Sequence, residues 1–349
     1  DLPGWYKHKE NMRTQKNRSK RTQLVMAKST SRQSIYALLI LTLLLSLPAC
    51  ATTPPEPSPS PTAQENTPTP SMPTQQPTPI PSQTPTLEPT QPAVDSQHTL
   101  MVGELERNYW LHTPPGLDPN IPVPVVFAFH ELGGVASMFK IKGLAELADQ
   151  HGFLIVKPSG YGFGNAQSWN AGFCCGAAVN KNMDDIAFVR AILDDLQSRC
   201  NLDQQRIYAT GHSNGAMFAY RLACEMSETF AAIAPIAGTP AIPYCQGAQP
   251  VSIMHVHGLN DTSIPFEGKG DPQDQFYIPS ISQSLSEFAK LYQCDPNPSV
   301  ETLENGITHT VYAACKDESS VSLYAIAGLS HAQPEPYQFN AAEAMWDFF

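Results

Sequence analysis

The most informative segment of this chain is Arg206-Ile-Tyr-Ala-Thr-Gly-His-Ser-Asn-Gly-Ala-Met-Phe-Ala-Tyr-Arg-Leu-Ala223. Its first five residues alternate as a β-strand does, and the residues after Gly215 have the composition of a helix. Between them, Ser213 stands two residues from Gly211 and from Gly215, which is typical of a strained strand-to-helix turn that presents a nucleophile. Such a turn lifts the serine Oγ clear of the sheet and leaves the next N–H free to bind an oxyanion. The segment therefore predicts an enzyme with a serine nucleophile.

From about Ser96 onward, apolar strand-like runs alternate with helical stretches, the pattern of a mostly parallel central sheet with helices on both faces. We find no internal repeat and no second core, so residues 96–349 are expected to form one catalytic domain. The expected fold is α/β, of the α/β-hydrolase type, because the serine turn lies within this alternation. Strands are expected at 99–112 (a strand or a hairpin), 123–130, 153–158, 206–210, 231–238, 251–257 and 321–327, and helices at 184–197, after 215, at 282–291 and at 337–349.

A serine hydroxyl is a weak nucleophile unless a histidine, itself oriented by a carboxylate, takes its proton. In α/β-hydrolases the acid follows the serine in the chain, and the histidine follows the acid. Asp261 comes after the expected strand 251–257 and His331 after the expected strand 321–327, so both stand where such sheets build their sites. Ser213, Asp261 and His331 are therefore the expected catalytic triad. The alternatives are that Asp261 belongs to a simple turn and that His309 is the base.

The second part of the expected site is an oxyanion hole. The strand that ends at His130 runs into Glu131-Leu-Gly-Gly134, and a glycine-rich loop at this place supplies the second N–H donor in such folds. The expected donors are the backbone N–H groups of Asn214 and of Glu131 or Leu132. The candidate substrate contacts beside these donors are His130 and His212.

Trp169 closes the loop Tyr161-Gly-Phe-Gly-Asn-Ala-Gln-Ser-Trp169, which follows the strand ending at Pro158 on the same rim as the triad. Two roles are open for it. It could be an aromatic platform that binds a sugar or phenolic ring of the substrate. It could also be a structural plug that packs the loop onto the core beside Cys174-Cys175.

His255 and His257 occupy alternate positions of one expected strand and so share a face. Such a pair could suggest a metal site, but no third ligand is evident. A packed or hydrogen-bonded pair is expected instead, and no metal or cofactor.

The charge of the chain is unevenly distributed. The whole chain has a formal net charge of -11, yet nine of its 21 basic residues and only two of its 32 acidic residues precede Ser34. The remainder therefore has a net charge of -18. So acidic a domain is a poor partner for nucleic acid or for an anionic membrane surface. It suits a neutral polymer or small esters.

The first ninety-five residues differ in kind from the rest. Residues 1–25 are interpreted as a non-native upstream extension. Residues 26–49 are interpreted as a lipoprotein-type signal peptide, with a basic start and an apolar core too short to span a bilayer. Leu47-Pro-Ala-Cys50 resembles a lipobox, which makes Cys50 the expected lipidation site and only membrane anchor. Residues 50–95 are rich in Pro, Thr and Ser and are expected to be a disordered linker. The protein is thus expected to be exported and either anchored at the cell surface or extracellular.

A set of motifs stands in order from Arg107 to Phe349. They are Arg107-Asn-Tyr109, Phe129-His130 with Gly133-Gly134, Trp169 with Cys174-Cys175-Gly176, Asp184-Asp-Ile-Ala-Phe188, Arg206 to Gly215, Arg221-Leu-Ala-Cys224-Glu225, Ala234-Pro-Ile-Ala-Gly238, His257-Gly258 with Asp261, and Gly328 with His331. This ordered set resembles that of the bacterial poly(3-hydroxybutyrate) depolymerase-like esterases, which overlap with feruloyl and acetyl-xylan esterases. The resemblance implies the same triad, Ser213, Asp261 and His331.

The chain departs from the family pattern at three sites that bear on the acyl pocket. Glu131 stands where the family usually has a glycine, Leu329-Ser330 stand in place of glycines, and Gln333 stands where the family often has a tryptophan.

The cysteines suit an exported protein, since seven remain when Cys50 is set aside and an odd number leaves at least one thiol unpaired within the chain. The family often pairs cysteines at the places of Cys294 and Cys315, so this bridge is expected. Cys200 is the expected free thiol. The other candidates for bridges, whose connectivity the sequence leaves open, are Cys174, Cys175, Cys224 and Cys245.

Together these features predict a secreted serine carboxylic-ester hydrolase that acts through an acyl-enzyme on polymer-derived or plant-polymer-derived esters. Hydroxyalkanoate, feruloyl and acetyl-xylan esters all remain open. Two alternatives come from other classes, a non-catalytic polymer-binding surface lipoprotein and a peptidase on the same fold. The sequence does not indicate an oligomeric state.

Overall fold

The computed structural model describes residues 92–349, apart from residues 119, 243–244, 246–247 and 272–276. The predictions for residues 1–91, including the export signal and lipidation at Cys50, lie outside the described residues. Strand β1 begins at Val94, so the last residues assigned to the linker belong to the sheet. Among the described helices, none combines the length and the hydrophobicity that crossing a bilayer requires.

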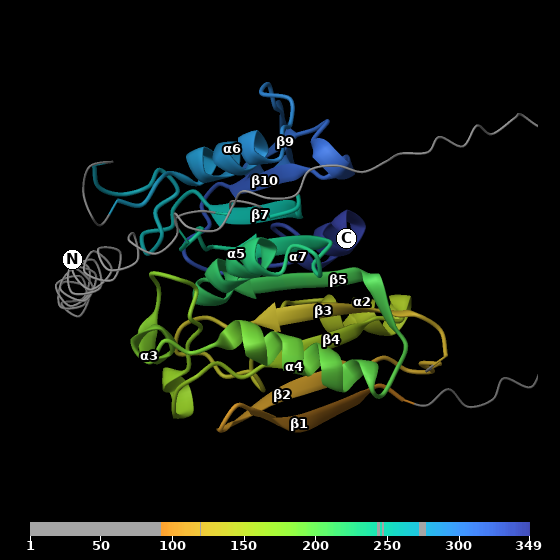
Figure 1. Ribbon diagram of the computed structural model, residues 1–349. Helices are drawn as coiled ribbons and strands as arrows, with labels where there is room; N and C mark the ends of the chain where they lie inside the picture. Colours follow the sequence, from red (N-terminus) through yellow and green to blue (C-terminus); the bar gives the residue numbers. More distant parts are fainter. Residues whose placement is uncertain (1–91, 119, 243–244, 246–247, 272–276) are drawn as a thin grey trace, which may run out of the picture. The chain divides into compact units, whose positions relative to one another are not determined.

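A ten-stranded sheet runs through the described part, in the order β1-β2-β4-β3-β5-β6-β7-β10-β9-β8 (Figure 1). The six strands from β4 to β10 in this order are parallel, and antiparallel pairs close both edges. The central strands are continuous apolar runs because both of their faces are covered, and all seven residues of β3 are buried. The strands are β1 Val94–Val102, β2 Leu105–Thr113, β3 Val123–Phe129, β4 Leu154–Pro158, β5 Leu202–His212, β6 Ala232–Ile236, β7 Ser252–Gly258, β8 Ser299–Leu303, β9 Ile307–Tyr312 and β10 Val321–Ile326.

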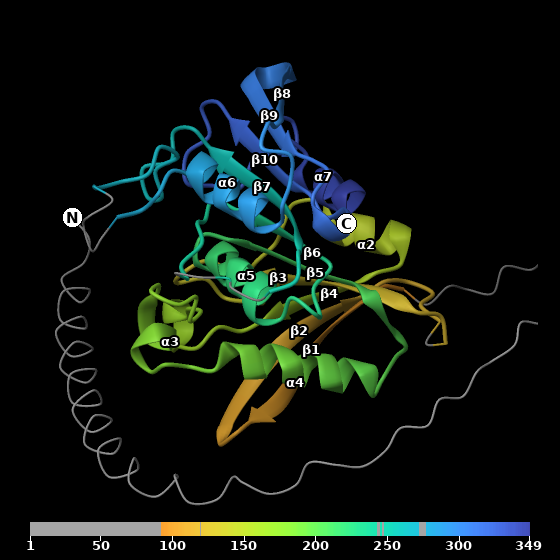
Figure 2. The same ribbon diagram turned by 45° about the horizontal axis from the view of Figure 1, so that its top comes forward.

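Helices cover the sheet on both faces (Figure 2). One hydrophobic cluster joins the sheet to α4, α5 and α6, and a second joins its other face to α2 and α7. Caps fix several helix starts, since Asp184 accepts from the Ala187 N–H before α4 and Ser280 accepts from the Gln283 N–H before α6. The helices are α2 Leu144–His151, α3 Gly176–Asn180, α4 Asp185–Gln197, α5 Asn214–Glu225, α6 Ile281–Leu291 and α7 Ala341–Phe348.

The prediction of an α/β-hydrolase fold with a mostly parallel sheet is confirmed. The elements α2, α3, β8 and β9 were not predicted, and β5 begins at Leu202 rather than at 206. The bounds of two further elements differ. The expected strand or hairpin at 99–112 is the β1–β2 hairpin and begins earlier, at Val94. The last helix begins at Ala341 rather than at 337, because the Asn340 side chain accepts from the Glu343 N–H and starts the helix there.

Three disulfides join cysteines of the described part, Cys174–Cys175, Cys224–Cys245 and Cys294–Cys315. The last of these connects the end of α6 to the segment after β9, the two places at which the resemblance implied a bridge. Cys200, at the end of α4, is free and half-buried.

Candidate active site

Ser213 occupies the turn between β5 and α5 with φ 55° and ψ -115°. A positive φ is unfavourable for a residue with a side chain, so the surrounding structure must hold it there. Gly211 and Gly215 make that possible. A Cβ at Gly211 would lie 2.6 Å from the Gly215 carbonyl carbon, and one at Gly215 would lie 2.1 Å from the Phe129 carbonyl oxygen. The two glycines therefore allow the turn to pack closely against the end of β3.

Three residues that are distant in the sequence meet at this turn. The Ser213 Oγ lies 2.9 Å from the His331 Nε2, and the His331 Nδ1 lies 2.7 Å from the Asp261 Oδ2. Asp261 follows β7 and His331 follows β10, and these strands are direct neighbours in the sheet. The Asp261 side chain is fully buried, whereas that of His331 is 23% exposed. The arrangement can move a proton from the serine hydroxyl to a histidine held by a carboxylate.

Asp261 is held as an ionised carboxylate. Its Oδ1 accepts the backbone N–H groups of Ser263 and Ile264, each at 2.8 Å. Burial alone would raise the pKa of Asp261, but hydrogen bonds from His257, from His331 and from the Ile264 N–H outweigh it and lower the pKa to about 2. The side chain is therefore an acceptor at neutral pH.

The alternative base, His309, lies elsewhere. It belongs to β9, where its Nδ1 is 3.1 Å from the Glu301 Oε1 and its ring stacks on Tyr324. The structure does not bring it to Ser213.

The loop after β3 lies beside the serine turn. Two of its N–H groups are engaged, because Gly133 donates to the Gln167 carbonyl at 2.8 Å and Gly134 donates to the Glu131 carbonyl at 2.9 Å. Glu131 and Leu132 remain the candidate donors of this loop. On the other side, Asn214 is the first residue of α5, so its N–H has no acceptor within the helix.

His212 precedes the serine and lies close to the base, with 5.2 Å between its ring centroid and that of His331. Burial, and then the nearby His331, lower the pKa of His212 to about 4, so its ring is neutral at physiological pH. Its Nδ1 is 4.0 Å from a Glu131 carboxylate oxygen, and its side chain is 12% exposed. It remains a candidate neighbour of a bound substrate.

Trp169 is fully buried, and this corrects the idea that it is an aromatic platform for substrate. Its ring lies edge-on to Phe129 and stacks on Phe218. The indole Nε1–H donates to the His130 carbonyl at 2.9 Å. The residue is the structural plug, because neither face of the ring is open to a ligand.

His130 is also fully buried and so is not a substrate contact, contrary to expectation. Its Nδ1–H donates to the Glu131 carbonyl at 2.7 Å, and its Nε2 accepts the Gly160 N–H at 3.0 Å. Burial lowers the pKa of His130, which fits a neutral ring with one donor and one acceptor nitrogen. Its role is to fix the loop that begins at Glu131.

The side chain of Asn214 was not identified from the sequence. Its Oδ1 accepts the Trp169 N–H at 2.7 Å and its Nδ2–H donates to the Trp169 carbonyl at 3.1 Å. Since Trp169 also binds the His130 carbonyl, one residue ties the serine turn to the loop after β3. No local sequence pattern signals a pair 45 residues apart.

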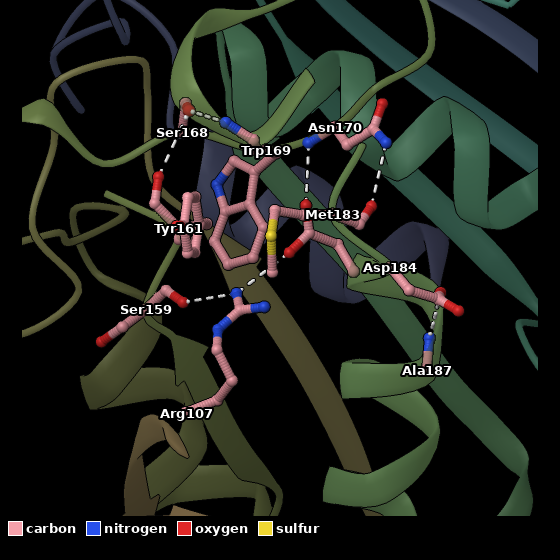
Figure 3. Close-up of polar contacts among 12 residues, drawn as sticks. Arg107, Ser159, Tyr161, Ser168, Trp169, Asn170, Met183, Asp184 and Ala187 are labelled. Carbon is pink, nitrogen blue, oxygen red and sulfur yellow. Dashed lines mark hydrogen bonds and ion pairs between the residues drawn. The ribbon is translucent and has the colours of Figure 1, made fainter. Parts of the chain in front are cut away.

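A buried ion pair holds the segment between β4 and α3, which contains Trp169 (Figure 3). The Arg107 Nη2 donates to the Ser159 carbonyl at 3.0 Å and to the Asp185 Oδ1 at 2.9 Å. The other carboxylate oxygen of Asp185 accepts the Asn170 N–H at 2.8 Å, and the Asn170 side chain donates to the Met183 carbonyl at 2.9 Å. The backbone at Ser159, Asn170 and Met183 is thereby connected to Asp185, the first residue of α4.

Among the described residues, no cluster of three or more His, Cys, Asp or Glu side chains could hold a metal ion. His255 and His257 form a hydrogen-bonded pair, with 2.9 Å between the His255 Nε2 and the His257 Nδ1. This is the arrangement expected from their alternate strand positions.

Comparison with known proteins places these features in a family. Residues 111–283 match the family model described as the dienelactone hydrolase family. A probable feruloyl esterase C of Aspergillus niger is 30% identical over 252 residues, which cover 70% of this chain and 83% of that protein. A poly(3-hydroxyalkanoate) depolymerase C of Paucimonas lemoignei is 23% identical over 242 residues, which cover 64% of this chain and 58% of that protein.

Among solved structures, an acetyl xylan esterase from Aspergillus awamori superposes with a TM-score of 0.53 at 17% sequence identity. The match covers 72% of this chain and 98% of that one. At this identity the likeness concerns the fold alone.

Proposed function

This chain belongs to the dienelactone hydrolase family of α/β-hydrolases, and we propose that it is a serine carboxylic-ester hydrolase that acts on polymer-derived esters. The observation that carries the proposal is the continuous set of contacts from Asp261 through His331 to the Ser213 Oγ. A binding protein has no need of a base at 2.9 Å from a strained serine.

In the proposed reaction, the Ser213 Oγ attacks the ester carbonyl while the His331 Nε2 takes its proton. Asp261 accepts the Nδ1–H of His331 and stabilises the imidazolium that forms. The backbone N–H groups of Asn214 and of Leu132 or Glu131 receive the negative charge that develops on the carbonyl oxygen. His331 returns the proton to the leaving alcohol, and water then releases the acid from the acyl-enzyme by the same steps.

The named relatives support esters of polymers or polymer fragments as substrates, since one is described as a feruloyl esterase and another as a poly(3-hydroxyalkanoate) depolymerase. Apolar side chains on the rim support the same class. Leu132 is 49% exposed and Phe163 is 94% exposed, on two loops joined by the hydrogen bond from Gly133 to Gln167. An aromatic or polyester chain would cover them, whereas a small charged ester would not.

We also propose that the enzyme is exported. Three disulfides in the described residues suit an oxidising compartment. Anchoring through a lipid on Cys50 remains a proposal from the sequence.

The decisive experiment measures hydrolysis of p-nitrophenyl acetate by the purified protein and by Ser213→Ala. We expect activity in the former, none in the latter, and covalent labelling of Ser213 alone by a fluorophosphonate probe. Equal hydrolysis by both proteins would remove Ser213 from the mechanism, and absence of labelling would favour a binding protein.

The acyl group is then identified by comparing methyl ferulate, acetylated xylan and hydroxybutyrate oligomers. Each reports one of the three ester classes. A peptide substrate serves as the control for the peptidase alternative, and preferential cleavage of the peptide would overturn the assignment as an esterase.

A further inference from the structure

A row of buried polar side chains leads away from Asp261. It consists of Tyr220 in α5 and of His255 and His257 in β7. The Tyr220 hydroxyl lies 2.7 Å from the His255 Nδ1, and the His255 Nε2 lies 2.9 Å from the His257 Nδ1. Both histidines are fully buried and Tyr220 is 1% exposed. The proposed mechanism uses none of the three.

The end of the row next to Asp261 determines which ring nitrogen atoms bear protons. The His257 Nε2 lies 2.9 Å from the Ile264 carbonyl oxygen and 3.4 Å from the Asp261 Oδ2. Both oxygens only accept hydrogen bonds, so the His257 Nε2 must bear a proton and donate it. In a neutral ring the Nδ1 of His257 is then an acceptor.

The hydrogen-bond partners determine the protonated nitrogen of the next ring in the same way. The His257 Nδ1 requires a donor, so His255 must bear its proton on Nε2, and its Nδ1 is in turn an acceptor. The Tyr220 hydroxyl supplies that last hydrogen. Every donor points toward Asp261, and each ring nitrogen in the row has a partner. Burial lowers the pKa of His255 well below its usual range, which keeps its ring neutral.

We propose that Tyr220, His255 and His257 form a one-directional hydrogen-bond relay that positions Asp261, and through it His331, for catalysis. The inference rests on the proposed esterase function and deepens it by adding positioning residues to the triad. His257 reaches both the carboxylate of Asp261 and the carbonyl of Ile264, and it therefore holds the turn that carries the acid. His255 and Tyr220 act by fixing the ring of His257 in the form that donates to that turn.

The first test compares two replacements of His257 in the full chain. In His257→Gln, the amide can accept from His255 and donate toward Asp261, whereas His257→Leu can do neither. We expect His257→Leu to lower kcat for p-nitrophenyl acetate by about 10- to 100-fold at unchanged KM, the loss that follows from one hydrogen bond to a charged group. His257→Gln should retain most of the kcat. Equal losses in both variants, or a change in KM alone, would overturn the relay.

A second pair removes a single hydroxyl and so limits the risk of misfolding. Tyr220→Phe deletes the first donor, and Tyr292→Phe is its matched control, because Tyr292 is an equally buried tyrosine outside the relay. We expect kcat to fall only in Tyr220→Phe. Equal kcat in the two variants would overturn the assignment of Tyr220.

The protonation pattern can be read without any activity. Imidazole ¹⁵N chemical shifts of the full chain should show the proton of His255 and of His257 on Nε2, with Nδ1 accepting a hydrogen bond in each ring. A proton on the Nδ1 of His257 would overturn the relay even in an active esterase. If the wild-type protein cleaves no ester, the proposed function fails, and the chemical shifts still decide whether the relay exists.

Discussion

Replacing Trp169 with phenylalanine should destabilise the protein and slow all ester substrates together. The substitution keeps an aromatic ring among Phe129 and Phe218 but removes the indole N–H. That N–H is the donor to the carbonyl of His130, the residue directly before the loop that holds the candidate oxyanion donors. The change therefore acts on the core through the lost ring atoms and on the site through the lost N–H.

The magnitude follows from burial and from the lost hydrogen bond. Trp169 is fully buried, so the smaller ring leaves a cavity, and the His130 carbonyl loses its partner at 2.9 Å. Together these effects should lower the free energy of unfolding by roughly 2–4 kcal/mol. In a domain of this size that corresponds to a fall in Tm of about 5–15 °C. The value of kcat should fall by up to about 100-fold, because shifting an oxyanion donor costs no more than the lower end of the loss seen when such a donor is removed.

The assay combines thermal unfolding with kinetics on p-nitrophenyl acetate and on a polymeric ester. Trp346→Phe is the matched control, because this tryptophan stacks on Phe153 in the other hydrophobic cluster. It should lose some stability and keep its kcat. A Trp169→Phe variant with normal Tm and normal small-ester turnover, but a raised KM for the polymer, would refute the reasoning and restore the platform role.

Three further predictions concern stability. The pKa of His212 is about 4 in the folded protein and 6.5 when unperturbed, so the unfolded chain binds the extra proton and stability falls as the pH drops from 6.5 toward 4. His212 should lower the free energy of unfolding by about 2 kcal/mol at pH 5 relative to pH 7. In urea unfolding, the stability of His212→Asn should therefore depend less on pH than that of the wild type. Replacing Cys294 and Cys315 by serine should lower the free energy of unfolding by about 3 kcal/mol, because the bridge closes a loop between cysteines 21 residues apart. An unchanged denaturation midpoint would contradict this. Asp185→Asn should lower the free energy of unfolding by about 3–5 kcal/mol, because it leaves the buried Arg107 without its ion pair. A calorimetric Tm equal to that of the wild type would contradict this prediction.

Much of the fold was accessible from the sequence because its strongest signals are local. The continuous apolar run of β3 and the glycines around Ser213 each indicate a local backbone conformation that does not depend on distant residues. The order of residues then placed Asp261 and His331 in loops at one edge of a parallel sheet. These features follow from periodicity and topology.

The direction of side chains in loops could not be predicted in this way. His130 was expected to contact a substrate and Trp169 had two open roles, but both side chains are fully buried. No periodicity constrains the direction of a loop residue. The short, mixed strands β8 and β9 had no clear alternation to mark them individually. The bonds from Asn214 to Trp169, and from Tyr220 to His255, join positions 45 and 35 residues apart, which only the folded chain brings together.

The positions of the three triad residues in the chain also determine how late the site forms during folding. Ser213 and His331 are 118 residues apart and Asp261 and His331 are 70 apart, so the base arrives only when β10 has docked beside β7. Contacts of such long range form slowly, because the intervening chain must be closed first. A chain that has formed only β3, β5 and α5 would have a serine turn without a base. Recovery of hydrolysis during refolding is therefore expected to follow the docking of β10 beside β7 rather than collapse of the core.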